Sequence, residues 1–248
     1  GTVSLIDPAS NEVVGSRAVG LSSSFPSNQY TPDLTDESED ALWLNVEQGV
    51  RALTAGTLEE VARVDTGSGA NWQEQTPDGS YVVVSAREPS HTNYRLDADR
   101  DSETFGEVTG ELDRTDEGGR GGNDGPGPCD VTIHPNGEYA YVPDLFGDTL
   151  TVVSIDPFEI ETQIDVESLG DGPARPWMGT VSPDGETLLV EHDEGGTGTE
   201  SIWDVSDPTT PEETVRLTAD DGLGRRPLTS EIGPDSETGY VFTPGSND

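Results

Sequence analysis

Two glutamates and three other polar side chains hold equivalent places in a pattern that recurs along the chain. Counting three residues back from each of four turn prolines gives Glu74, Thr132, Thr180 and Glu231, and Gln29 is the equivalent in a degenerate fifth copy. Polar groups are costly to bury unless they are paired or hydrated, so we expect this register to face a water-filled channel. Glu74 and Glu231 could bind a cation there, and oxygen ligands favour calcium. The alternative is a solvated channel without a specific ligand.

Two histidines and the single cysteine could form a different kind of site. His91 and His192 are expected in loops on one face of the molecule, with Cys129 nearby, and imidazole and thiolate ligands suit copper or zinc. His134 comes just before a turn proline at the opposite end of its strand, so we expect it to be a packed structural residue. One cysteine excludes an intramolecular disulfide.

Arginines and tryptophans mark the places where strands begin on the same face. The residues expected at this ligand-binding mouth are Trp72, Asp130, Arg175, Trp177 and Arg226. Arginine is scarce in the chain, and its planar guanidinium suits carboxylate and phosphate groups, so the face could capture an anionic group. Structural pairing with the many carboxylates explains these arginines nearly as well.

A run of four short strands must position these side chains. Residues 130–134, 138–142, 149–155 and 161–166 read as strands, and Pro135-Asn136-Gly137 supplies a turn between the first two. One four-stranded sheet cannot bury both of its faces alone, so it needs similar neighbours.

The same unit recurs five times. The turn positions Glu37, Asp78, Asn136, Asp184 and Asp235 lie 41, 58, 48 and 51 residues apart, and the path from Asp235 through both ends back to Glu37 is 50. This recurrence predicts an all-β, single-domain β-propeller of five blades with four antiparallel strands each. The N-terminal strands would close the ring by pairing with the C-terminal ones, and a β-sandwich is the alternative. The blades would span residues 20–66, 67–113, 128–168, 175–218, and 225–248 together with 1–19.

Residues 115–128 interrupt this regular spacing. The segment TDEGGRGGNDGPGP is rich in glycine and lacks apolar anchors. We therefore expect a mobile loop between two blades.

The unit VTIHPNGEYAYV followed by GDTLTVVSIDP resembles the YVTN-type β-propeller repeat. Relatives in this family commonly have seven blades of about forty residues, so the resemblance implies either a small ring or a part of a longer one. The family includes surface proteins, binding scaffolds, and lactonase-like and dehydrogenase-like enzymes. It therefore implies export or surface attachment as an expectation, but does not specify a reaction.

The charge of the chain indicates its environment. With 50 acidic and 12 basic residues, all arginine, the net charge is −38. Molar salt shortens the Debye length to about 3 Å and screens this repulsion, so we expect a halophilic protein, from a haloarchaeon, that holds cations and water at its surface. The expected location is extracellular or the cell surface, with the cytoplasm of a salt-accumulating halophile as the alternative. A nucleic-acid partner is disfavoured by the negative surface, and no apolar run is long enough to span a membrane.

Two classes of function remain open, and the sequence does not decide whether the chain is an enzyme. The first is a binding scaffold that recognises a protein or a small anionic ligand through its loop-bearing face and central channel. The second is a lactonase-like, metal-dependent hydrolase or lyase. In that case Glu74, Glu231 and Asp130 would hold a cation that polarises a carbonyl, while Arg175 or Arg226 anchors a carboxylate.

Overall fold

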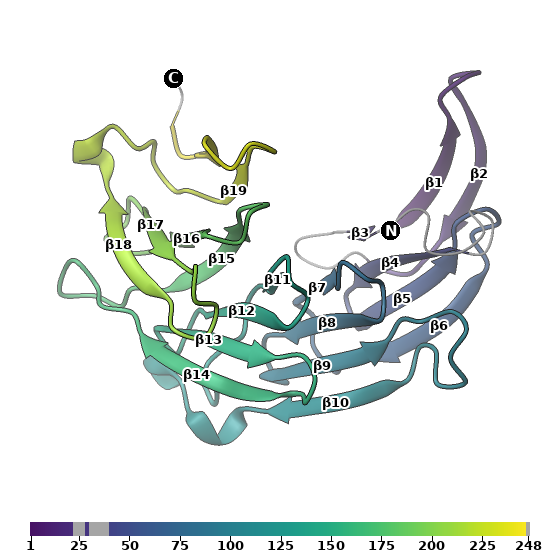
Figure 1. The fold of residues 1–248 in the computed structure, drawn as a ribbon, viewed down its shortest axis with the longest axis horizontal. Helices are drawn as coiled ribbons and strands as arrows, with labels where there is room; N and C mark the ends of the chain where they lie inside the picture. The colour runs from purple at the N-terminus through teal and green to yellow at the C-terminus, as the bar shows by residue number, and fades with distance from the viewer. Residues whose placement is uncertain (22–27, 30–39, 247–248) are drawn as a thin grey trace. The chain divides into compact units, whose positions relative to one another are not determined.

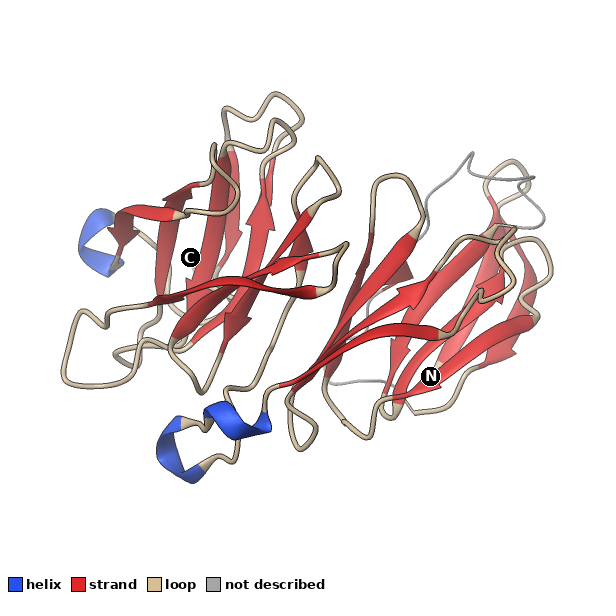
Figure 2. Ribbon diagram, turned by 60° about the horizontal axis from the view of Figure 1, so that its bottom comes forward, coloured by secondary structure: helices blue, strands red, loops and turns tan. Residues whose placement is uncertain are grey.

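The computed structural model describes residues 1–21, 28–29 and 40–246, and their regular structure is almost entirely β (Figure 1, Figure 2). Twenty strands form four four-stranded and two two-stranded antiparallel sheets within these ranges. The chain divides into two compact units, residues 1–111 and 112–248, which are described separately below. The predicted turn at Glu37 lies outside the described residues.

The first unit contains three sheets in chain order. The strands are β1 (Thr2–Asp7) and β2 (Glu12–Ala18); β3 (Asn28–Gln29), β4 (Ala41–Val46), β5 (Gly49–Thr54) and β6 (Glu60–Asp65); β7 (Asn71–Gln75), β8 (Tyr81–Ala86), β9 (Thr92–Asp97) and β10 (Val108–Asp113), the last of which continues into the second unit. Each sheet is a meander in which consecutive strands are hydrogen-bonded neighbours.

The second unit repeats this arrangement and adds three short 3-10 helices. Its strands are β11 (Thr132–Ile133), β12 (Tyr139–Asp144), β13 (Thr149–Ser154) and β14 (Glu159–Asp165); β15 (Pro176–Val181), β16 (Thr187–His192), β17 (Thr199–Asp204) and β18 (Glu212–Leu217); β19 (Thr229–Ile232) and β20 (Gly239–Phe242). The helices are η1 (Thr115–Glu117), η2 (Arg120–Gly122) and η3 (Ala219–Asp221). The four strands predicted between residues 130 and 166 are thus confirmed to within a few residues.

Hydrophobic side chains between successive sheets form the cores of each unit. In the second unit, Tyr141, Leu150 and Val152 of one sheet pack with Leu188 and Val190 of the next. In the first unit, comparable clusters lie between the sheets that contain β4 and β8, and between β1 and the sheet of β4 and β5. Burying each such side chain contributes about 1.5–3 kcal/mol. A sheet sandwiched between neighbours on both faces is the arrangement that the repeat predicted.

Four residues of the predicted polar register occupy equivalent positions in the strand pairing of their sheets. Glu74 pairs with Val83, Thr132 with Tyr141, Thr180 with Leu189, and Glu231 with Tyr240, so each partner lies six residues after its turn proline. The first strands of consecutive sheets are also neighbours within each unit, β3 beside β7 and β15 beside both β11 and β19. First strands that meet in this way are typical of blades arranged around a common axis.

The turns of consecutive repeats in the second unit are hydrogen-bonded to one another. His134 Nε2 lies 3.0 Å from the Gly185 carbonyl oxygen, and the Ser236 hydroxyl accepts a bond of 3.1 Å from the Asp184 amide. A Cβ at position 185 would lie 2.6 Å from His134 Nε2, so glycine is required there. His134 is therefore the packed structural residue that was predicted.

The two terminal sheets, β1–β2 and β19–β20, each contain two strands. Apolar side chains on both are exposed, among them Val13 and Val14 on β2 and Tyr240 and Phe242 on β20. Five complete blades and a closed ring therefore remain a prediction.

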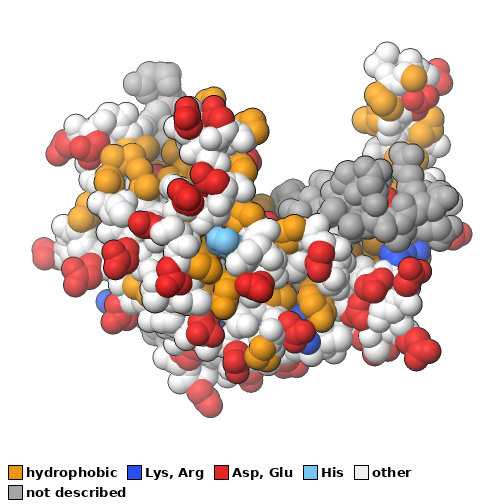
Figure 3. Space-filling model, in the orientation of Figure 1, with side chains coloured by type: hydrophobic (Ala, Val, Ile, Leu, Met, Phe, Trp, Pro, Cys, Tyr) orange, Lys and Arg blue, Asp and Glu red, His pale blue; other side chains and the backbone are white. Residues whose placement is uncertain are grey.

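The surface is strongly acidic. On the face drawn in Figure 3, aspartate and glutamate side chains are spread over the described residues, with little arginine among them. The described part of the chain contains no helix of the length and apolarity needed to cross a membrane.

Candidate functional site

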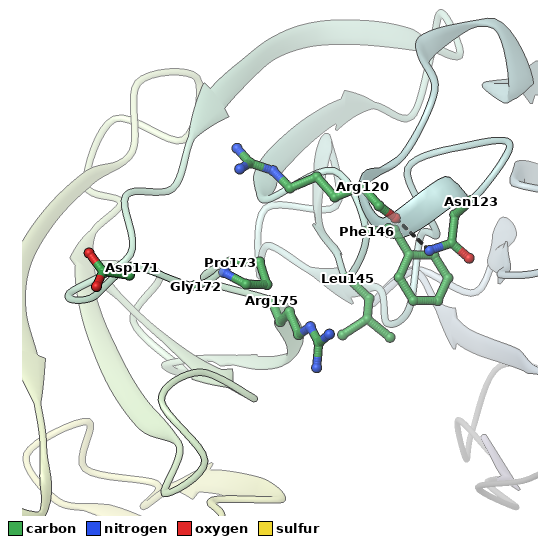
Figure 4. A pocket seen from close by; sticks show the side chains of 9 residues that line it. Arg120, Asn123, Leu145, Phe146, Asp171, Gly172, Pro173 and Arg175 are labelled. Carbon is green, nitrogen blue, oxygen red and sulfur yellow. Dashed lines mark hydrogen bonds between the residues drawn. The ribbon is translucent and has the colours of Figure 1, made fainter.

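A pocket of about 450 Å³ lies in the second unit and is lined by two arginines and by apolar side chains (Figure 4). It is formed by the segment before β11, the turn between β12 and β13, and the loop before β15. The residues that line it are Arg120, Gly121, Asn123, Leu145, Phe146, Asp171, Gly172, Pro173 and Arg175.

The apolar wall is built by close backbone packing. Leu145 and Phe146 lie in the turn after β12, where the Leu145 amide donates to the Gly127 carbonyl at 3.0 Å and the Arg120 amide donates to the Phe146 carbonyl at 2.8 Å. Gly127 has a φ of 69°, and a Cβ there would lie 2.5 Å from Phe146 Cδ2. The glycine therefore lets the two segments approach and fixes the ring of Phe146.

Asp148 organises both arginines of the pocket. One carboxylate oxygen of this buried residue pairs with Arg120 Nε at 2.7 Å, and the other accepts a hydrogen bond of 2.9 Å from the Arg175 amide. One carboxylate thus places the Arg120 side chain and the backbone from which Arg175 extends.

The guanidinium groups are accessible to a ligand. The side chains of Arg120 and Arg175 are 66% and 48% exposed. Arg120 pairs with Asp148 through Nε, whereas Arg175 pairs with the exposed Asp193 at 3.2 Å. An exposed pair of this kind is worth only about 0–1 kcal/mol, so an anionic ligand can displace it.

The segment that carries Arg120 is anchored by a buried ion pair. Arg114 donates to both carboxylate oxygens of Asp144, at 2.7 and 2.8 Å, and also to Glu117 and Thr151. Residues 115–128 also contain η1 and η2 and a bridge from Pro128 to Asp144. The segment is thus held by an arginine that lies just before it rather than by an apolar side chain, and its mobility remains a prediction.

Electrostatics keep Arg114 and its partner Glu117 charged. Burial alone would lower the pKa of Arg114, but the charge of Asp144 and the hydrogen bonds to Glu117 and Asp144 raise it above its usual value. Burial would likewise raise the pKa of Glu117, yet the hydrogen bond and charge of Arg114 hold it below its usual value.

The predicted ligand-binding residues divide between the two units. Arg175 lines the pocket, and Trp177 follows it on β15, partly buried. Asp130 is buried and accepts a hydrogen bond of 2.8 Å from the Gly179 amide, so it ties one sheet to the next. Arg226 is exposed after η3, with its amide bonded to the Thr197 carbonyl at 2.5 Å, and Trp72 lies on β7 of the first unit.

The residues of the polar register differ in exposure. Glu74 and Thr180 are half-buried, Thr132 is buried and Glu231 is exposed. The Thr180 hydroxyl donates to the Ser230 carbonyl at 2.9 Å, which links β15 to β19. Gln29 lies on β3, and its side chain is outside the described part. Calcium binding by Glu74 and Glu231, which belong to different units, remains a prediction.

The proposed copper or zinc ligands are each held in local structure. His192 is fully buried with Nε2 2.7 Å from the Ser201 hydroxyl, and burial and the charge of Arg216 keep its pKa well below the usual range. His91 is buried in the loop after β8, and Cys129 is half-buried with its amide bonded to the Pro143 carbonyl. Among residues 1–21, 28–29 and 40–246, no group of three or more His, Cys, Asp or Glu side chains could hold a metal ion.

Sequence reasoning missed Arg120, Phe146 and a buried acidic pair. Glu191 and Glu200 lie opposite each other on β16 and β17 with 0% exposure. Burial raises the pKa of Glu191 to about 7, against a smaller lowering by the Ser230 hydroxyl. Burial and then the charge of Glu191 raise the pKa of Glu200 to about 10.

Comparisons with known proteins bear on the fold. No family model and no curated protein matches the chain. Among solved structures, hydrazine synthase of Kuenenia stuttgartiensis matches with a TM-score of 0.61 and 19% identity over 83% of this chain and 53% of that one. A protein of unknown function from Desulfotomaculum acetoxidans matches with a TM-score of 0.69 and 16% identity over 98% and 69%. A candidate 6-phosphogluconolactonase from Bacteroides uniformis matches with a TM-score of 0.60 and 17% identity, over 87% of this chain and 60% of that one.

The chain thus spans about half the length of the hydrazine synthase chain that it matches. The similar structures, which also include Hsv2 of Kluyveromyces lactis, are β-propeller-type folds. At identities below 20% this likeness shows the fold and not the activity. The all-β meander sheets and these neighbours together support a β-propeller-type fold.

Proposed function

We propose that this chain is a halophilic, YVTN-type β-propeller that acts as a binding scaffold and captures an anionic group in the arginine-lined pocket. The observation that carries the proposal is the presence of two exposed arginine side chains in a pocket that Leu145 and Phe146 also line, in a chain of net charge −38. A surface this acidic repels anions, so a local pair of arginines is what anion binding requires.

The composition of the pocket favours a particular kind of ligand. Guanidinium groups form charge-assisted hydrogen bonds with carboxylates and phosphates, while Leu145, Phe146 and Pro173 offer apolar surface. A carboxylate attached to an apolar or aromatic body, on a small molecule or on a protein partner at the cell surface, satisfies both.

Binding of benzoate in molar potassium chloride, measured by ligand-observed NMR, tests this proposal. Losing one charge-assisted contact costs about 1.5–3 kcal/mol, so Arg120→Ala or Arg175→Ala should weaken binding about 10- to 150-fold. Arg63→Ala is the control, because Arg63 is exposed and paired with Glu60 in the first unit. If the Arg120→Ala/Arg175→Ala double variant bound benzoate as tightly as the wild-type protein, the proposal would be refuted.

The alternative is a lactonase-like hydrolase or lyase, which the structural likeness to the candidate 6-phosphogluconolactonase favours. Here a cation at Glu74 and Glu231 would polarise a carbonyl. Calcium-dependent hydrolysis of lactones that disappears in the Glu74→Gln/Glu231→Gln variant would establish this alternative. Hydrolysis that depends neither on calcium nor on these two glutamates would exclude it.

We also propose that β1–β2 and β19–β20 complete one blade and close a five-bladed ring, with a longer ring of more blades as the alternative. Each terminal sheet has two strands where the inner sheets have four. A compact chain of this length should have a radius of gyration of about 18 Å in small-angle scattering. A clearly larger value for the monomer would refute closure within the chain.

A further inference from the structure

Two glutamates are buried side by side in the fourth repeat. Glu191 and Glu200 are direct partners in the β16–β17 ladder, and both have 0% exposure. Side chains directly opposite each other in antiparallel strands have Cβ atoms about 4.5–5.5 Å apart, and like charges there repel. Their neighbours along the row across the sheet are Met178 and Leu217, which supply no positive charge.

The hydrogen-bonding capacity of this pair is unused. None of the four carboxyl oxygens has a hydrogen-bond partner among the described residues. The hydroxyl of Ser230, a residue only 5% exposed, forms no hydrogen bond of regular distance and angle there, although it lies close enough to Glu191 to lower the pKa of that carboxyl as a hydrogen-bonding neighbour. Buried polar atoms in native proteins are nearly always paired, so three unpaired groups at one place indicate a missing partner.

The strand that carries Ser230 is held against this face of the sheet. The Thr180 hydroxyl donates to the Ser230 carbonyl at 2.9 Å, and Leu189 lies 3.1 Å from where a Cβ on Gly239 would be. Thr180 and Leu189 face the same way as Glu191, because residues two apart on a strand share a face. The acidic pair therefore lies where β19–β20 covers β15–β18.

Protonation is the competing way to satisfy this site, because two carboxyl groups that keep their protons can donate to each other and accept from a hydroxyl. One divalent cation neutralises both carboxylates and takes carboxylate, hydroxyl and backbone oxygens as ligands, and calcium accepts six to eight of them.

We propose that Glu191, Glu200 and Ser230 form a buried calcium site that fastens β19–β20 to the preceding four-stranded sheet. The site has two carboxylates and one hydroxyl, and backbone oxygens would complete its shell. It is separate from the arginine-lined pocket and from Glu74 and Glu231.

Calcium titration of the whole chain tests the site. Protein exchanged into chelator and then into metal-free molar potassium chloride at pH 8 is titrated with calcium chloride, and bound calcium is measured by equilibrium dialysis. We expect one calcium per chain and a rise of several degrees in the melting temperature. Glu191→Gln and Glu200→Gln should abolish both, and Ser230→Ala should weaken binding about tenfold or more.

Glu212→Gln is the matched control, because it removes a charge from an exposed position in the same sheet. The glutamine variants keep the side-chain shape and remove buried charge, so their metal-free melting temperatures should be at least those of the wild type, which shows that they fold. Wild-type protein without stoichiometric calcium overturns the proposal. So does calcium retained by both glutamine variants, which would assign the ion elsewhere.

Discussion

Replacing Asp144 by asparagine should destabilise the second unit more than almost any other single loss of charge. Asp144 is fully buried and accepts hydrogen bonds from Arg114 at 2.7 and 2.8 Å, from Thr149 at 2.7 Å and from Thr151 at 2.6 Å. The variant keeps the shape of the side chain but leaves the buried guanidinium of Arg114 without its main counter-charge.

The magnitude follows from burial. Breaking a buried ion pair from one side costs about 3–5 kcal/mol, because the remaining charge stays desolvated. Glu117 still pairs with Arg114 at 2.8 Å, so we expect the lower end, about 3 kcal/mol. Replacing both residues, as Arg114→Met/Asp144→Leu, should cost less than the single change, since no fully buried charge remains and Glu117, which loses its arginine, is 31% exposed.

Urea unfolding at fixed molar potassium chloride, followed by circular dichroism, measures this difference. The control is Asp193→Asn, which removes a half-exposed carboxylate paired with Arg175 and should cost less than about 1 kcal/mol. A loss below about 1 kcal/mol for Asp144→Asn, or a double variant less stable than the single one, would refute the reasoning.

Three further outcomes are expected. Gly127→Ala should weaken benzoate binding, because its Cβ would meet Phe146, whereas Gly118→Ala, with a similar φ of 71° and open space around it, should not. In chelator, the raised pKa values of Glu191 and Glu200 mean that their stabilisation is complete below the unfolded carboxyl pKa of about 4.3 and is lost as the pH rises through 7 and towards 10. The slope of stability against pH, up to about 1.4 kcal/mol per proton and pH unit, should flatten in the double glutamine variant; an unchanged slope would contradict this. Lowering salt from 1 M to 0.1 M, which lengthens the Debye length from about 3 to 10 Å, should lower the melting temperature, and a constant value would contradict the halophilic assignment.

Local turn chemistry made the repeat predictable. Pro135-Asn136-Gly137 and its equivalents mark where each second strand begins, and the alternation of apolar residues marks its length. The same spacing correctly placed Glu74 and Glu231 in one backbone register. Arg175 was recognised because arginine is scarce.

The remaining site residues depend on contacts between distant segments. Arg114 and Asp144 are 30 residues apart in the sequence, and no sequence motif near either residue indicates that they pair. Arg120 lies in a glycine-rich segment that reads as a loop. Glu191 could not be separated from the many surface acids, although its place directly after Leu188, Leu189 and Val190 was a usable signal for burial.

The hydrogen bond from the His134 ring to the Gly185 carbonyl has a consequence for how such a chain can evolve. A histidine in one repeat is matched to a glycine in the next, because a Cβ at position 185 would collide with the ring. A new repeat inserted between them by duplication would have to place a glycine against His134 on one side. On the other side it would need a side chain that donates a hydrogen bond to the Gly185 carbonyl, as His134 does now. The two repeats are therefore sterically matched. Duplication or loss of both repeats together preserves this match, whereas exchange of either one alone breaks it.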